Sequence, residues 1–251
     1  MIEHLLFRIY GPMVSWGSIA VGEERATHLH PTKSSIMGLV AGAFGLTREM
    51  DDEHLKLNKT TGYAVEVLNR GTPLRDFHTA QVPQKYRNTR WFSRKDELQK
   101  TPGGINTVTS NREYLNDAFY TICLWKKKNK TSCYPLPDIK EALQKPKFIP
   151  YLGRKSCPPG IFFNPKLVET KTLYEAFQNG EFSEELDFAD LSNEQNPFYF
   201  WDKAHPNSGL EVLQEHRIRD EVVSRSRWQF ANRWEFRGIR PRNLEKKNAD
   251  K

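Results

Sequence analysis

The residues best suited to chemistry lie together at positions 151–158, which read Tyr-Leu-Gly-Arg-Lys-Ser-Cys-Pro. Glycine permits positive φ angles and lets backbone N–H groups approach an anion closely. Arginine supplies a planar fork for phosphate, lysine a mobile charge and serine a further hydrogen bond. Gly153, Arg154, Lys155 and Ser156 therefore predict a seat for a nucleic-acid backbone. A glycine turn with two solvated charges has the same composition and is the alternative interpretation.

The overall composition favours a nucleic-acid partner. The 251 residues include 38 Lys and Arg against 31 Asp and Glu, a net charge of +7, and 12% are aromatic. Cations interleaved with aromatic rings suit RNA, whose unpaired bases stack on rings and guanidinium planes. The length allows one large or two small domains with a sizeable core.

Neither a metal nor a cofactor is expected. The three cysteines, Cys123, Cys133 and Cys157, form no C-x-x-C pair, so no disulfide framework and no zinc site is indicated. The first residues run directly into a strand-like segment and lack the pattern of a signal peptide. No apolar run approaches the length needed to cross a membrane, so a cytoplasmic protein is expected.

The order of the expected elements predicts an α+β fold for residues 1–160. Helices are expected behind Thr32, which would cap the first one, and from Pro137 to Leu143. Gly45 is placed to end the first helix, and Gly11-Pro12 to stop the first strand. Strands are expected at residues 5–10, 63–68, 74–79, 118–125 and 148–152.

This β-α-β, insertion, β-α-β order is typical of a ferredoxin-like or RRM-like sandwich, with helices on one face of an antiparallel sheet. The open face of such a sheet is a usual RNA platform. The insertion, at about residues 79–112, is too long for an ordinary loop. It interleaves aromatic residues with an excess of cations, so it predicts an arm that grips or kinks a strand, with contacts from Lys85, Arg87 and Arg90. A partly disordered, solvated loop is the alternative.

Residues 161–251 are expected to form a β-containing extension packed on this domain. The acidic segment 169–194 would repel RNA and is expected to face solvent or a basic protein partner. In the arginine-rich segment 217–242, alternating aromatic residues such as Trp228 and Trp234 predict a strand face in the core. The tail 240–251 is expected to be frayed.

Five segments resemble, in order and spacing, the CasD family of type I-E CRISPR Cascade subunits, a family of RAMP proteins. They span about three-fifths of the chain, and the match beyond Pro158 is looser. The segments are Gly-Pro-Met-Val-Ser-Trp-Gly at 11–17, Pro-Thr-Lys-Ser-Ser with Gly-Leu at 31–39, Leu-Arg-Asp-Phe-His-Thr at 74–79, Arg-Glu-Tyr-Leu at 112–115, and Lys-Pro-Lys-Phe through Gly-Arg-Lys-Ser-Cys-Pro at 145–158.

The resemblance implies an RRM-like palm with the insertion as a β-hairpin thumb. It implies a non-catalytic subunit that holds the 5′ handle of the crRNA and caps the backbone filament. Its implied partners are a CasC-type backbone subunit and a CasA-type large subunit, with target DNA bound through the assembled complex.

Further candidate RNA contacts follow from these segments. Lys33, Ser34 and Ser35 lie at a helix N-terminus, where N–H groups and the helix dipole favour an anion. Trp16 and Tyr151 are candidates to stack on unpaired bases, with a core role as the alternative for Trp16. The remaining candidates lie in the loop after the first strand or flank the base of the arm: Arg25, Arg75, His78 and Arg112.

Two other functions stay open. A metal-free endoribonuclease that processes CRISPR repeat RNA needs a base, a donor for the leaving oxygen and cations on the phosphate. His78, with Tyr86 and Lys85 or Arg87, could supply these groups. A free-standing RNA-binding module that joins no complex is the second alternative.

Overall fold

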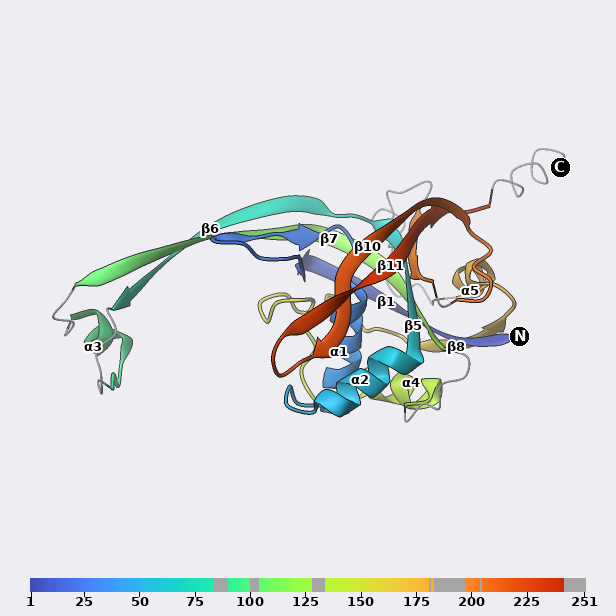
Figure 1. Ribbon diagram of the computed structural model, residues 1–251, viewed down its shortest axis with the longest axis horizontal. Helices are drawn as coiled ribbons and strands as arrows, with labels where there is room; N and C mark the ends of the chain where they lie inside the picture. Colours follow the sequence, from blue (N-terminus) through green and yellow to red (C-terminus); the bar gives the residue numbers. More distant parts are fainter. Residues whose placement is uncertain are drawn as a thin grey trace.

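A largely antiparallel sheet organises the chain in the computed structural model, which describes residues 1–83, 90–99, 104–127, 134–180, 182, 197–203 and 205–241. Its main path runs β10-β11-β9-β5-β7-β1-β8, so strands from both ends of the sequence meet in one sheet (Figure 1). The strands are β1 (Ile2–Val14), β5 (Thr61–Asn69), β7 (Ile105–Lys126), β8 (Lys166–Thr170), β9 (Phe198–Asp202), β10 (Glu211–Ser224) and β11 (Gln229–Ile239).

Three helices pack together on one face of this sheet: α1 (Lys33–Phe44), α2 (Asp51–Thr60) and α4 (Leu136–Gln144). The caps expected for α1 are confirmed, because the Thr32 side chain accepts from the Ser35 N–H and Gly45 closes the helix at φ 77°. Apolar side chains from α1 and α4 join those of β1, β5 and β7 in one buried cluster. The two helices predicted from the sequence therefore lie together on one face of the sheet.

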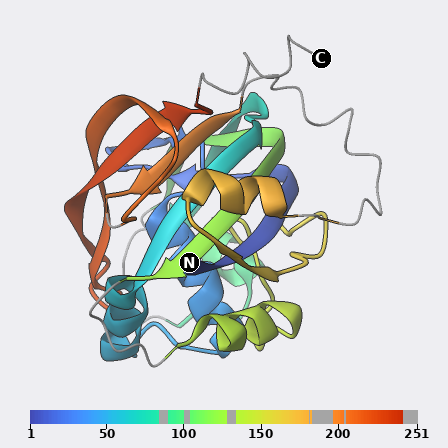
Figure 2. The same ribbon diagram turned by 90° about the vertical axis from the view of Figure 1, so that its right-hand side faces the viewer.

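The opposite face of the sheet is also covered, by α5 (Leu173–Asn179), which lies in front of the strands in Figure 2. A second buried cluster forms there, with Leu6 and Cys123 from the sheet, Phe177 from α5 and Trp201 from β9. The expectation of an open sheet face as an RNA platform is therefore wrong, because the chain beyond β8 folds back over it. Cys123 is a buried core residue, as expected.

A long two-stranded ribbon projects from the body (Figure 1). It consists of β6 (Thr72–Pro83) and the first half of β7, paired antiparallel from Thr72 with Asn116 to Pro83 with Ile105. A short helix, α3 (Arg94–Gln99), contacts β6 near the far end. At the base, β3 (Glu24–Arg25) pairs in parallel with β7, and β2 (Trp16–Gly17) pairs with β4 (Thr27–His28).

Among the predicted strands, the first was expected to end too early and the last is absent. The first strand continues through Gly11-Pro12 to Val14, because Gly11 and Met13 still pair with β7. Residues 148–152 form no strand: the Phe148 N–H donates to the Gly42 carbonyl in the last turn of α1, and Pro150 has no N–H to give to a ladder. The strand that pairs with the other edge of β1 is instead β8.

The hairpin of β10 and β11 curls over α1 and α2 (Figure 1). Its aromatic residues do not form the buried face that their alternation predicted. Trp228 lies in the turn at φ 57° and is 59% exposed, and Trp234 is 41% exposed while its neighbour Glu235 is fully buried. Charged groups therefore occupy the interior side of this hairpin.

Candidate nucleic-acid interface

The loop at 151–158 packs against the end of β1. The Ser15 N–H donates to the Leu152 carbonyl at 3.1 Å, and the Leu152 N–H donates to the Cys157 carbonyl at 2.7 Å. Gly153 has φ 86°, and a Cβ there would lie 1.7 Å from the Ser15 carbonyl oxygen. This close approach is enough by itself to explain why residue 153 is a glycine. An anion contact from its N–H stays a prediction.

Arg154 ties this loop to two other segments. Its Nη2 donates to the Arg25 carbonyl at 3.0 Å, and its guanidinium lies 4.5 Å from the centre of the Tyr114 ring. Its Nη1 is buried and has no hydrogen-bond partner among the described residues. Because the fork is fixed on a ring and one donor is unmet, Arg154 is held ready for an acceptor. Lys155 and Ser156 beside it are exposed.

Three arginines from separate segments meet at the base of the ribbon. Arg25 of β3 is the register partner of Arg112 in β7, and Arg154 binds the Arg25 carbonyl. Arg75 of β6 lies on the same base, where its Nη2 donates to Glu24 at 2.8 Å. Glu24 also accepts from Asn111 at 2.8 Å, so carboxylates are interspersed with the cations and hold them in place.

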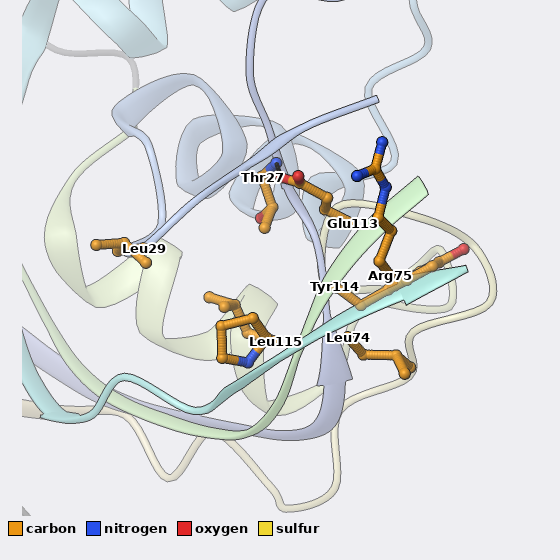
Figure 3. A pocket seen from close by; sticks show the side chains of 8 residues that line it. Thr27, Leu29, Leu74, Arg75, Glu113, Tyr114 and Leu115 are labelled. Carbon is orange, nitrogen blue, oxygen red and sulfur yellow. Dashed lines mark hydrogen bonds between the residues drawn. The ribbon is translucent and has the colours of Figure 1, made fainter. Parts of the chain in front are cut away.

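A cavity of about 220 Å³ opens beside these residues (Figure 3). Thr27 and Leu29 line one side, and Pro73, Leu74, Tyr114 and Leu115 of the ribbon base line the other. The Thr27 N–H donates to Glu113 at 3.2 Å, which fixes the segment before α1 against β7. Arg75 and Glu113 complete the lining. A largely apolar hollow beside a cluster of arginines can take an unpaired base whose phosphates lie near those cations.

Some predicted contacts point elsewhere. Trp16 is 1% exposed, and its Nε1 donates to the Tyr120 hydroxyl at 3.2 Å. The core alternative therefore holds for Trp16, because a ring buried on both faces cannot stack on a base. Tyr151 is 45% exposed and is available for stacking.

The N-terminus of α1 already holds an anion. The Lys33 N–H donates to Asp220 at 2.8 Å, and Ser34 and Ser35 are only partly exposed behind Thr32. Lys33 itself is fully buried, with its Nζ 3.2 Å from Asp202. Burial lowers the pKa of Lys33, and the nearby Asp202 carboxylate opposes that effect. The predicted phosphate contact of Lys33 is therefore wrong, because internal carboxylates take both its charge and the helix dipole.

The ribbon carries the remaining candidates. His78 is half-buried and pairs through Nε2 with Asp76 on the same strand. Arg90 is exposed, with its guanidinium 5.7 Å from the centre of the Phe92 ring, which is 85% exposed. Lys85 and Arg87 lie outside the described residues, as do Cys133, half of the acidic segment and most of the tail.

Sequence reasoning missed Tyr114, Glu24 and Leu29 as parts of this site. Tyr114 lies inside the 112–115 segment, so its place next to Arg112 was the available signal. No signal in the sequence pointed to Leu29 or Glu24, because their role depends on β3 and β4 folding back onto the ribbon. Across the described ranges, no group of three or more His, Cys, Asp or Glu residues could hold a metal ion. The helices of those same ranges include none that is long and apolar enough to cross a membrane.

Comparison with known families decides the relationship. The family model described as CRISPR-associated protein (Cas_Cas5) matches residues 4–242. The chain belongs to the Cas5 family. It is 30% identical over 167 residues to the CRISPR system Cascade subunit CasD of Escherichia coli (strain K12), which covers 63% of this chain and 68% of that protein. The resemblance to CasD subunits is thereby confirmed.

Solved structures show the same fold. A chain of a CRISPR RNA-guided surveillance complex aligns with a TM-score of 0.58 at 23% identity, covering 94% of this chain and 88% of that chain. A crystal structure of a Cas protein aligns with a TM-score of 0.54 at 20% identity, covering 96% of each chain. Both alignments span the ribbon-bearing domain and the C-terminal hairpin together.

Proposed function

We propose that this Cas5-family chain is a non-catalytic, cytoplasmic RNA-binding subunit of a type I-E CRISPR complex. It holds the 5′ handle of the crRNA and caps the backbone filament. Its protein neighbours are a CasC-type backbone subunit and a CasA-type large subunit, and target DNA binds through the assembled complex. The names of its relatives, a Cascade subunit and an RNA-guided surveillance complex, support this assignment.

The fold supports the same proposal. Within the sheet, β5, β7, β1 and β8 are adjacent in that order, and α1 and α4 connect β1 to β5 and β7 to β8. This is the order of a ferredoxin-like unit, which we assign as an RRM-like palm. The ribbon of β6 and β7 is then the thumb, and β9 to β11 extend the palm.

One observation carries the choice of site: Arg25, Arg112 and Arg154 come together from three segments at the base of the ribbon. Lys155 stands exposed beside them, and Tyr114 and Tyr151 offer rings. Cations fixed on aromatic rings bind a single strand through its phosphates and stack its bases. The handle therefore lies across this base, between the palm and the ribbon.

Binding of handle RNA to the full chain tests the proposal. Replacing Arg154 and Lys155 together by alanine should weaken binding at low salt, and the loss should shrink as salt rises, because phosphate contacts act through released counterions. Lys171→Ala removes one exposed charge near α5 and is the control. A loss that is independent of salt, or equal loss in the control, contradicts the proposed site.

A second candidate, a metal-free endoribonuclease, is favoured only by the His78–Asp76 pair, in which a carboxylate orients an imidazole. The other groups it needs, Tyr86 with Lys85 or Arg87, lie outside the described residues. Incubating the protein with repeat RNA and a chelator decides the matter. Cleavage that His78→Ala abolishes would replace the non-catalytic proposal.

A further inference from the structure

A second cavity, of about 330 Å³, adjoins the first, since Leu29 lines both. Its other walls come from His28 and His30, from β5 with Arg70 just after it, from β9, and from the hairpin of β10 and β11. No acidic residue is among the described residues that line it. The function proposed above makes no use of this space.

The floor of the second cavity is apolar and rigid. Val67 is 2% exposed, and the His30 ring stacks on Phe200 with the ring centres 3.9 Å apart. His30 is fixed on both sides, because its Nδ1 lies 3.0 Å from the Pro31 carbonyl and its Nε2 lies 3.3 Å from Glu235. Such a floor can receive a flat ring without first reorganising.

Planar cations border this floor. The guanidinium groups of Arg70 and Arg237 lie 4.6 and 4.3 Å from the centre of the Phe198 ring. The Nε of Arg237 is buried with no hydrogen-bond partner among the described residues. An unmet buried donor is costly, so this group fits a ligand that brings an acceptor.

Two further polar groups come from β10. The exposed amide of Gln214 is the cross-strand neighbour of Arg237, and His216 follows two residues later on the same face. His216 meets Glu235 through Nε2 at 3.2 Å, and its buried Nδ1 has no partner in the described part of the chain. An amide and an imidazole can read the edge of a base, and arginine forks suit phosphate.

We propose that this second cavity takes one unpaired nucleotide of the bound RNA, splayed from the strand that crosses the ribbon base. The base enters over Leu29 and Val67 toward Gln214, and its phosphate lies against Arg237. This inference rests on the proposed function, since the same strand must occupy both cavities.

The test uses the full chain and a set of short single-stranded RNAs of the handle sequence, each with one abasic nucleotide at a different position. Fluorescence anisotropy gives the Kd for each. One position should stand out, with a loss on the order of tenfold, because stacking of one base contributes about 1–3 kcal/mol. In Arg237→Gln and in Gln214→Ala, the intact RNA should bind more weakly and the penalty at that position should shrink.

Arg217→Gln is the matched control: it removes the same charge from the same hairpin, where Arg217 lies 4.7 Å from the Trp234 ring outside the cavity. It should leave the penalty at the abasic position unchanged. Gln214→Ala keeps the test decisive if Arg237→Gln fails to fold, since Gln214 is exposed. A penalty that survives both cavity variants, or no sensitive position at all, overturns the inference.

The outcomes also separate the two proposals. If RNA binds and Lys155 matters but Arg237 does not, only the second cavity loses its assignment. If the chain binds no RNA, alone or in its complex, both fail. If the cavity variants release a protein subunit and leave the abasic penalty intact, the cavity belongs to a protein interface and the nucleotide assignment is wrong.

Discussion

Two short basic motifs of similar composition lie in opposite environments in this molecule, one in the interior and one at the surface. Lys33-Ser34-Ser35 begins α1 and faces inward, where Asp202 and Asp220 meet its charge and its backbone. Arg154-Lys155-Ser156 lies in the loop on the ribbon base and leaves Lys155 in solvent. The motifs themselves do not differ enough to predict this. Acidic residues supplied by β9 and β10, far along the chain, decide which motif has charge left for a ligand.

The largest expected effect tests the inward motif. Lys33→Ala removes a cation that lies 3.2 Å from the buried Asp202, whose carboxylate also lies 3.2 Å from Lys127. Removing one partner of a buried ion pair costs about 3–5 kcal/mol, so the free energy of unfolding in urea should fall by about this much. Lys155→Ala should change it by less than about 0.5 kcal/mol. Equal losses of stability in Lys33→Ala and Lys155→Ala would contradict the distinction between a buried and an exposed motif.

The interior should also respond to acid. Burial lowers the pKa of His4 and His205 to about 4, and their Nε2 atoms lie 3.0 Å apart. The unfolded chain takes up protons first, near the ordinary histidine pKa of about 6.5, so stability is full above that pH and is lost as the pH falls toward 4. Thermal melts across this range should show the decline. His4→Phe should flatten it, and an unchanged acid dependence in that variant would contradict the assignment.

A loss of stability of intermediate size should follow from a change at Gly153, the residue just before the surface motif Arg154-Lys155-Ser156. Gly153→Ala places a Cβ against the Ser15 carbonyl at a positive φ, which should cost roughly 1–3 kcal/mol and shift Arg154 away from Tyr114. RNA affinity should fall although no charge is removed. Gly17→Ala, where a Cβ meets no atom within 4 Å, is the control. If Gly153→Ala binds RNA normally, the loop need not be held in this position.

The smallest effect should belong to Lys155→Ala. Its stability should stay near that of the parent chain, and its RNA affinity should fall a few-fold at low salt. If Lys155 meets one phosphate of a single strand, the slope of log K against log salt should become shallower by about 0.7. An unchanged slope would mean that Lys155 meets no phosphate.

Much of the palm could be predicted from local signals. Thr32 and Gly45 marked the ends of α1, and Pro137 marked the start of α4, because caps and proline act within one turn. The paired ribbon overlaps the inserted arm expected at about 79–112 but begins earlier, because residues 74–79 also pair with β7 in the ribbon. The five family segments located the ribbon base, where Arg154 binds the Arg25 carbonyl and Arg25 is the register partner of Arg112.

The rest depended on distant partners. α2 was missed because it buries polar residues, His54, Asn58 and Thr60, and so lacks an apolar period. The strand expected at 148–152 failed because its backbone bonds to α1 instead. The burial of Lys33 could not be predicted from its neighbours, because its partners come from β9 and β10. In each case the deciding contact lies outside the window in which a pattern can be read.

The bond from the Lys33 N–H to Asp220 has a consequence for synthesis. The two residues are 187 positions apart, so a ribosome adding about 5–20 residues per second makes the acceptor roughly 10–40 s after the donor. During that interval α1 has neither its anion nor the counter-charges of Lys33. The helix-covered sheet can therefore reach its final stability only once the last strands have emerged from the ribosome. A chain truncated before β10 exposes the cationic N-terminal end of α1.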